Sequence, residues 1–100
     1  MKRLFISQPM RNKSDEEILA VRANAIQAVK DLAGEDVEVL DSFFQNCPAD
    51  ASPLWFLGKS LELLSKADVA YFASGWTDAR GCRIEHACAV EYGIPAIIEA

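Results

Sequence analysis

The alternation of short apolar runs with longer amphipathic stretches constrains the fold of this chain more than any other feature. Each short run has the length and composition of a β-strand, and the four runs are Arg3–Ile6, Val37–Leu40, Asp68–Ala73 and Ile94–Ile98. The stretches between them carry apolar residues at helical spacing, and helices are expected from Ser14 to Gly34, from Ser52 to about Lys66 and from about Gly81 to Tyr92. Strands that alternate with helices are typical of a parallel sheet in an α/β protein.

Local signals mark the ends of the first two expected helices. Ser14 and Glu17 have the spacing of a capping box, and Gly34 stands where a left-handed residue commonly ends a helix. Ser52 is followed by Pro53, which suits the first helical position because no N–H donor is needed there. These signals support both helices independently of the hydrophobic periodicity.

Two of the strands have features of sheet edges. Pro95 cannot donate a ladder hydrogen bond, and the run Val37–Leu40 alternates in a way that fits a partly exposed strand. The first and third runs are more apolar, so they are expected inside the sheet, and right-handed crossovers then favour the strand order 2-1-3-4. The sequence therefore predicts one domain over residues 1–100, a Rossmann or flavodoxin-like three-layer sandwich around a four-stranded parallel sheet.

Composition and charge narrow the classes of partner. The 100 residues carry a net charge of −5 and contain no run of Lys or Arg, which argues against binding to a nucleic-acid polymer. The three cysteines, Cys47, Cys82 and Cys88, show no CxxC spacing, so neither a disulfide framework nor a zinc site is expected. No apolar run approaches the core of a signal peptide or the length of a membrane span. We therefore expect a cytoplasmic, soluble protein without a membrane partner.

Polar loops follow the two central strands and converge on one edge of the predicted sheet. In the order 2-1-3-4 the topological switch point lies between the first and third strands, where ligands of such sheets bind. The loops that open there are 7–13 and 74–80. Glu85 lies four residues after Gly81, so we expect it to project from the first turns of the third helix toward this crevice, beside Trp76. This carboxylate is the candidate for the chemistry of the site.

Each of these residues also has a purely structural interpretation. The helix dipole favours an acidic residue near a helix start, which applies to Glu85. Trp76 is as compatible with a place at the edge of the core as with a ligand platform. Arg11 and Arg80 are either solvated charges or phosphate contacts. His86, the only histidine, sits about 100° around the helix from Glu85, and we expect it to have a structural or interface role.

Three motifs of the chain resemble the nucleoside 2-deoxyribosyltransferase superfamily. They are Phe5-Ile6-Ser7-Gln8-Pro9-Met10-Arg11 after the first strand, Ala67-Asp68-Val69 at the start of the third, and Gly81-x-x-x-Glu85. The segment from Gly75 to Glu85 is similar to a small branch of this superfamily, related to the deoxynucleoside 5′-monophosphate N-glycosidases. The resemblance extends from Lys2 to Ile98.

The resemblance implies chemistry at an N-glycosidic bond. In this superfamily a glutamate on the helix after the third strand attacks the sugar C1′, and Glu85 matches that glutamate by position. The loop after the first strand holds sugar or phosphate, which implies ligand contacts for Ser7, Gln8, Met10 and Arg11.

The predicted site therefore has one catalytic residue, Glu85, and neither a metal nor a cofactor. Its predicted substrate-binding residues come from both loops, and they are Ser7, Gln8, Met10, Arg11, Ser74, Gly75, Trp76 and Arg80. The expected partner is a nucleoside or a nucleotide.

Two features depart from the pattern of the superfamily. Many members carry an aspartate on the second helix that helps to protonate the base, but the aligned residue here is Ser60, and Glu62 lies on roughly the opposite helix face. The sequence also stops after the fourth strand, so we expect a carboxyl-terminal contact to the sugar to be missing or to come from a neighbouring subunit. Two hypotheses follow: an enzyme that cleaves or transfers at the N-glycosidic bond, and a non-catalytic nucleotide-binding or sensing module with the same pocket.

Aromatic residues outside the predicted core favour self-association. Phe43, Phe44, Trp55 and Phe56 form more aromatic surface than one small core is expected to absorb. Because a large apolar patch usually marks an interface, a homodimer or a higher homo-oligomer is expected.

Overall fold

Strands and helices alternate along the chain in the predicted order. The structure is a computed structural model that describes residues 1–44 and 47–99, so positions 45, 46 and 100 of the predicted domain lie outside the described residues. The strands are β1 (Lys2–Ser7), β2 (Val37–Leu40), β3 (Val69–Phe72) and β4 (Ala96–Ile98). The helices are α1 (Asp15–Ala33), α2 (Pro53–Leu64) and α3 (Arg80–Glu91), together with a short 3₁₀ helix, η1 (Trp76–Asp78), that was not predicted.

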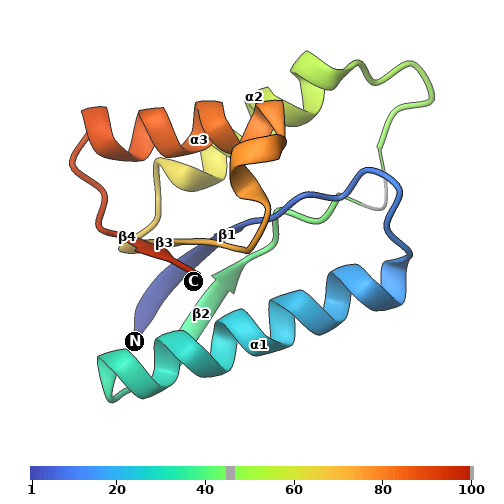
Figure 1. Ribbon diagram of the computed structural model, residues 1–100. Helices are drawn as coiled ribbons and strands as arrows, with labels where there is room; N and C mark the ends of the chain where they lie inside the picture. The colour runs from blue at the N-terminus through green and yellow to red at the C-terminus, as the bar shows by residue number, and fades with distance from the viewer. Residues whose placement is uncertain (45–46, 100) are drawn as a thin grey trace.

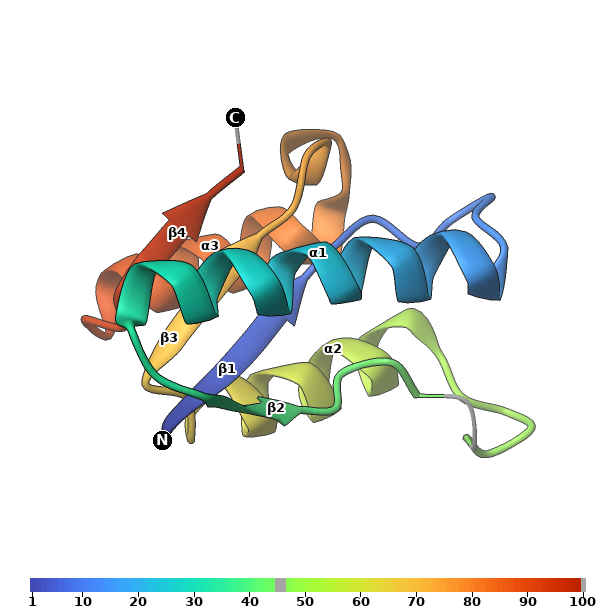
Figure 2. The same cartoon turned by 90° about the horizontal axis from the view of Figure 1, so that it is seen from below.

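The strands form one parallel sheet with the order β2-β1-β3-β4. β1 is central, and its Leu4 lies opposite both Val39 of β2 and Val69 of β3. Helix α1 covers one face of this sheet, and α2 and α3 cover the other (Figures 1 and 2). This three-layer arrangement confirms the predicted fold class and strand order.

The helix ends follow the local signals of the sequence. The Ser14 hydroxyl accepts a hydrogen bond from the Glu17 amide at 3.1 Å, and the Glu17 carboxylate accepts one from the Ser14 amide at 3.4 Å, which completes the capping box. Gly34 ends α1 with a φ of 68°, and Ser52 caps α2 by accepting from the Trp55 amide at 3.2 Å. Within residues 1–44 and 47–99, no helix combines the length and the apolar character that crossing a bilayer would require.

The two faces of the sheet carry separate halves of the hydrophobic core, because successive strand residues point to opposite faces. The half on the α1 side consists of Leu4, Ile6, Ala25, Val29, Val69, Tyr71 and Ala73. The half under α2 and α3 consists of Phe5, Leu64, Ala70, Phe72 and Ala89. The same alternation directs Ser7, at the end of β1, toward α3 and the next residue, Gln8, toward α1. The chain that leaves β1 therefore sends a polar side chain to each face.

Both predicted edge strands lie at the edges of the sheet. β4 is shorter than the expected strand Ile94–Ile98, since it begins at Ala96, directly after Pro95. Pro95 has no N–H to donate, but its carbonyl accepts from the Ala70 amide at 2.9 Å and so aligns the start of β4 with β3.

Candidate active site

Glu85 lies on the sheet-facing side of α3, in line with Cys82 and Ala89 one turn away on either side. Its side chain is buried, with the residue only 8% exposed. The Ser7 hydroxyl, at the carboxyl end of β1, donates a hydrogen bond to Glu85 Oε1 at 2.6 Å. A contact this short is typical of a hydroxyl bound to a charged carboxylate. Two segments 78 residues apart in the sequence thus meet at one carboxylate.

Two opposing effects act on the protonation of Glu85. Burial raises the pKa of the carboxyl group above its ordinary value, because the charged form loses contact with water. The hydroxyls of Ser7 and Ser60 act in the opposite direction, because they favour the carboxylate. Burial also raises the pKa of the neighbouring Cys82 thiol; a hydrogen bond with Ser7 opposes this shift, and the negative charge of Glu85 adds to it. At neutral pH Cys82 is therefore a protonated thiol, which is a weak nucleophile.

A cavity of about 590 Å³ opens onto Glu85 between the first turns of α2 and α3. Its size lies within the range of small-molecule sites in proteins. The residues that line it are Ser52, Pro53, Leu54, Phe56, Leu57, Ser60, Arg80, Gly81, Ile84 and Glu85. The walls are mainly apolar, and Arg80 and Glu85 are the two ionisable residues among those lining it. This cavity, called the larger cavity below, can hold a partly apolar ligand against a buried carboxylate.

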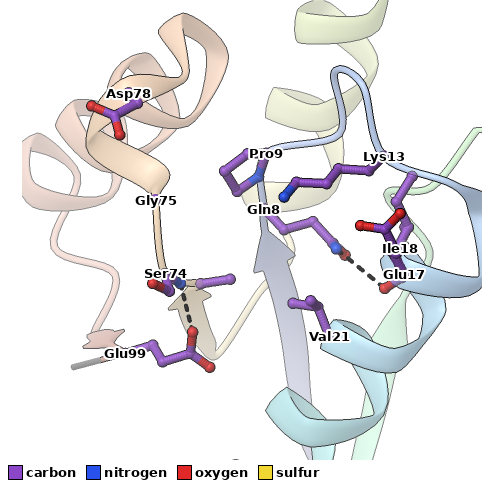
Figure 3. Close-up of a pocket in the computed structure, with 11 residues that line it drawn as sticks. Gln8, Pro9, Lys13, Glu17, Ile18, Val21, Ser74, Gly75, Asp78 and Glu99 are labelled. Carbon is purple, nitrogen blue, oxygen red and sulfur yellow. Dashed lines mark hydrogen bonds between the residues drawn. The ribbon is translucent and has the colours of Figure 1, made fainter.

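A second cavity, of about 290 Å³, lies on the α1 side of the same sheet edge (Figure 3). Its lining residues are Gln8, Pro9, Lys13, Glu17, Ile18, Val21, Ala73, Ser74, Gly75, Asp78 and Glu99. Glu99 closes one end, because its carboxylate accepts from the Tyr71 hydroxyl and from the Ser74 amide, both at 2.7 Å. Burial, the hydrogen bond to Glu99 and the negative charge of Glu99 raise the pKa of Tyr71 to about 12, so its hydroxyl stays a donor throughout the physiological range.

The sequence-predicted site residues are divided between these two cavities. Glu85 and Arg80 line the larger cavity, whereas Gln8, Ser74 and Gly75 line the smaller one. Ser7 lines neither cavity, but it donates a hydrogen bond to Glu85. Met10 and Arg11 line neither of the two cavities: Met10 is half-buried and its carbonyl accepts from the Lys13 amide at 3.1 Å, while Arg11 is exposed.

Trp76 is half-buried and stacks on the third helix. Its ring lies 4.3 Å from that of His86 and 5.7 Å from that of Phe72, measured between centroids. The His86 ring also contacts Phe72 edge-on at 5.0 Å. These contacts fix η1 against the start of α3, and they give His86 the structural surroundings expected for it.

Several residues near the site were not selected from the sequence. Lys13 and Glu99 line the smaller cavity, and Arg22 and Ser42 form a buried polar cluster beside Gln8. The sequence holds one usable signal: Arg22 occupies the apolar stripe of α1, four residues after Ile18 and three before Ala25. A charged residue in such a stripe is rarely buried without a polar partner. Across the described part of the chain, no group of three or more His, Cys, Asp or Glu side chains is placed to hold a metal ion.

Comparison with known proteins gives matches at the level of three-dimensional structure. No protein-family model matches the chain, and no curated protein matches it either. A conserved protein from Enterococcus faecalis V583 is similar, with a TM-score of 0.69, 17% sequence identity and 98% of this chain covered. The chain spans 62% of the length of that protein.

The second similar structure is a 2-deoxyribosyltransferase from the psychrotolerant bacterium Bacillus psychrosaccharolyticus, described as a biocatalyst for nucleoside synthesis. The TM-score is 0.62 at 18% identity, and the match covers 96% of this chain and 70% of the enzyme. In both comparisons nearly the whole of this chain matches part of a longer chain. The chain therefore has a nucleoside 2-deoxyribosyltransferase-like fold, as the resemblance of its motifs predicted.

Proposed function

We propose that this protein cleaves or transfers at the N-glycosidic bond of a nucleoside or nucleotide, with Glu85 as the nucleophile. One observation carries the proposal: a buried carboxylate, oriented by Ser7, faces a cavity of about 590 Å³ at the carboxyl ends of the central strands. Ligands of doubly wound sheets bind at this position. The fold shared with a 2-deoxyribosyltransferase supports the same chemistry.

The reaction has two steps in which the carboxylate is consumed and regenerated. A carboxylate oxygen of Glu85 attacks C1′ of the sugar, and the bond between C1′ and the base nitrogen breaks. The base leaves with the bonding electrons and takes up a proton, while an ester joins Glu85 to the sugar. In the second step a nitrogen of another base, or water, attacks C1′ and gives up its proton to solvent, and the bond between C1′ and Glu85 breaks to regenerate the carboxylate.

The surroundings of Glu85 suit this chemistry. The negative charge lies in an environment of low polarity, where it stabilises the positive charge that develops at C1′ more strongly than it would in water. The Ser7 hydroxyl holds one oxygen and so limits the rotation of the carboxylate. Phe56, Leu57 and Ile84 offer apolar surface for a base, and Arg80 offers a cation for a 5′-phosphate.

The second candidate function is a nucleotide-binding or sensing module that makes no covalent bond. The observation that favours it is Ser60, which is buried in the larger cavity at the position where many superfamily members have an aspartate. A serine hydroxyl is a poor acid, so the leaving base would take its proton from water. This arrangement is adequate for binding and disadvantageous for turnover.

The two candidates are separated by the release of free base. Wild-type protein, Glu85→Gln and the control Glu62→Gln are incubated with deoxynucleosides, ribonucleosides and their monophosphates, and free base is measured by chromatography. We expect release by the wild type and by Glu62→Gln, whose substituted side chain is exposed on α2. Glu85→Gln is expected to lose activity by at least about 1,000-fold while it still binds the substrate, because an amide cannot form the ester.

Either of two results would contradict the catalytic proposal. Base release by Glu85→Gln at the wild-type rate would remove Glu85 from the mechanism. Saturable binding by the wild type without any release of base would favour the binding module instead.

A further inference from the structure

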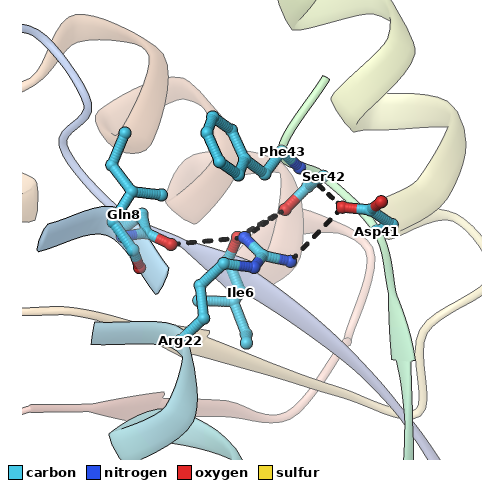
Figure 4. A network of polar contacts seen from close by, with 7 residues as sticks. Ile6, Gln8, Arg22, Asp41, Ser42 and Phe43 are labelled. Carbon is cyan, nitrogen blue, oxygen red and sulfur yellow. Dashed lines mark hydrogen bonds and ion pairs between the residues drawn. The ribbon is translucent and has the colours of Figure 1, made fainter. Parts of the chain in front are cut away.

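Arg22 places a guanidinium group in the interior of the α1 layer. The residue is 6% exposed, and its Nη1 donates to Gln8 Oε1 at 3.2 Å and to Ser42 Oγ at 3.3 Å (Figure 4). Its Nη2 is buried, has no hydrogen-bond partner among the described residues and lies 4.0 Å from Asp41 Oδ1. The Asp41 side chain is 81% exposed, so it compensates the buried cation only in part. This cation is costly for the fold, and burial accordingly lowers the pKa of Arg22.

The same cluster completes the hydrogen bonding at the end of β1. Pairing between β1 and β2 ends at Phe5 and Leu40, so β2 offers no further ladder partner beyond that point. The Ser42 hydroxyl, which accepts from Arg22, donates to the Ile6 carbonyl at 2.8 Å and takes the place of the next ladder bond. On the other side β3 continues the ladder, and the Ala73 amide donates to the Ser7 carbonyl at 2.9 Å. Ser42 is thus the contact that holds the β2 side of β1 at this point.

Gln8 is fixed from both ends of its amide group. Its Oε1 accepts from Arg22, and its Nε2 donates to the Ile18 carbonyl at 3.2 Å. Arg22 therefore holds the residues on both sides of Ser7: Ile6 through Ser42, and Gln8 directly. Ser7 itself points the other way, across the sheet, to Glu85.

We propose that Arg22 is a positioning residue for Glu85: through Ser42 and Gln8 it fixes the end of β1 and so holds the Ser7 hydroxyl on the Glu85 carboxylate. The catalytic meaning of this role rests on the proposed function, whereas the positioning itself does not. A contribution to stability is a weaker explanation. An apolar side chain would continue the stripe of Ile18, Ala25 and Val29, and it would avoid the desolvation of a guanidinium group whose Nη2 has no hydrogen-bond partner among the described residues.

The first test follows the titration of Glu85 and needs no catalysis. The side-chain carboxyl carbon of Glu85, assigned by its disappearance in Glu85→Gln, is titrated by NMR in each variant. Ser7→Ala serves as the reference for complete loss of the hydrogen bond, and it should raise the pKa of Glu85 because that bond favours the charged form. Arg22→Met and Ser42→Ala should raise the pKa of Glu85 in the same direction.

Two variants separate positioning from charge and from folding. Ser42→Ala keeps the guanidinium, so a shift in this variant cannot come from the loss of a positive charge, and it carries the test if Arg22→Met does not fold. Lys30→Met removes another cation of α1, one that pairs with Asp36 at 3.7 Å away from the site, and should leave the titration unchanged. Ser60, whose hydroxyl also favours the charged form of Glu85, is unchanged in every variant, as are Arg80 in the larger cavity and Cys82 on α3. A wild-type titration of Glu85 in both Ser42→Ala and Arg22→Met would overturn the proposal.

The second test uses base release. Arg22→Met and Ser42→Ala should lower kcat by about 10- to 100-fold with little change in KM, because a small displacement of a catalytic group costs this much. The acidic limb of the pH–rate profile should move to higher pH, and Arg22→Lys should recover part of kcat. Absence of base release by the wild type would refute the proposed function while the titration still decides the positioning role. Wild-type kcat and pH dependence in an active Ser42→Ala and Arg22→Met would overturn the positioning role alone.

Discussion

At the scale of the residue, Glu85 is a charged group that the fold buries at a cost. An acid at this point of a helix satisfies the helix dipole equally well when it is exposed, so the dipole alone does not explain its burial. The Ser7 hydroxyl compensates part of this cost, and the cavity in front of the carboxylate leaves space for a ligand. Stability and function are therefore expected to compete at this position.

Glu85→Gln is expected to stabilise the folded protein at neutral and alkaline pH. Because the pKa of Glu85 is raised in the folded state, its contribution to stability is fully present below the unfolded pKa and is lost as the pH rises through the folded pKa. Glutamine stays neutral and keeps an oxygen that can accept from Ser7, so the variant should unfold at a higher temperature than the wild type at about pH 8. The advantage should shrink as the pH falls below the folded pKa.

Thermal unfolding of the wild type and Glu85→Gln, followed by circular dichroism from acidic pH to about pH 8, measures the difference in unfolding temperature. Each 1 kcal/mol of stability corresponds to about 4–8 °C in a domain of this size. The same substitution at exposed Glu62 serves as the control and should change the unfolding temperature little, since surface charges of this kind contribute little to stability. A Glu85→Gln variant less stable than the wild type at every pH would contradict the prediction.

At the scale of the element, the ends of a helix could be predicted where they depend on neighbouring residues. The conformation of a loop that depends on contacts with a distant segment could not. The limits of α1 follow from Ser14 and Gly34, whose effects are confined to one helical turn. The helix η1 was not predicted, since it depends on Gly75 adopting a φ of 86° beside Pro9 of another loop. A left-handed glycine cannot be identified from its neighbours in sequence when the loop is shaped by tertiary contact.

The division of the site into two cavities illustrates the same limit. Residues 7 and 8 were assigned to one loop and therefore to one pocket, whereas strand alternation sends Ser7 and Gln8 to opposite faces of the sheet. The strand order was predicted correctly, whereas the location of a ligand site at the switch point between β1 and β3 stays a prediction. The side of the sheet on which each side chain lies depends on where β1 ends, which the composition of the loop does not reveal.

Two glycine substitutions should change stability in opposite directions. Gly75→Ala places a side chain at a φ of 86° and is expected to cost about 1–2 kcal/mol through backbone strain. The added Cβ would lie 3.5 Å from Pro9 Cγ, an ordinary contact, so strain and not collision sets the cost. Gly58→Ala, in the exposed interior of α2 with no atom within 4 Å, should stabilise by about 0.5–1 kcal/mol. Urea denaturation of both variants measures the change in the free energy of unfolding and therefore its sign. Stabilisation by Gly75→Ala would contradict the prediction.

At the scale of the whole molecule, the aromatic residues bear on self-association. Phe44, Trp55 and Phe56 are half-buried and pack against one another through edge-to-face and tilted ring contacts, with centroid distances of 5.0 to 6.5 Å. The prediction of an oligomer rested on this aromatic surface, and part of it is covered by contacts within the chain. Leu54, next to this cluster, remains 76% exposed at the larger cavity. The homo-oligomer stays a prediction, and Leu54 is the residue of choice for testing it.

We expect the wild type to sediment as a dimer at micromolar concentration and Leu54→Glu to dissociate more readily. A carboxylate at the centre of an apolar contact would be desolvated without a partner, and a penalty of about 1.4 kcal/mol already weakens association tenfold. Leu32→Glu is the matched control, because Leu32 is also exposed but lies on α1, in the opposite layer of the fold. A dimer that persists in Leu54→Glu but dissociates in Leu32→Glu would move the interface to the α1 face. A wild type that sediments as a monomer would reject self-association, and the larger cavity would then act without a neighbouring subunit.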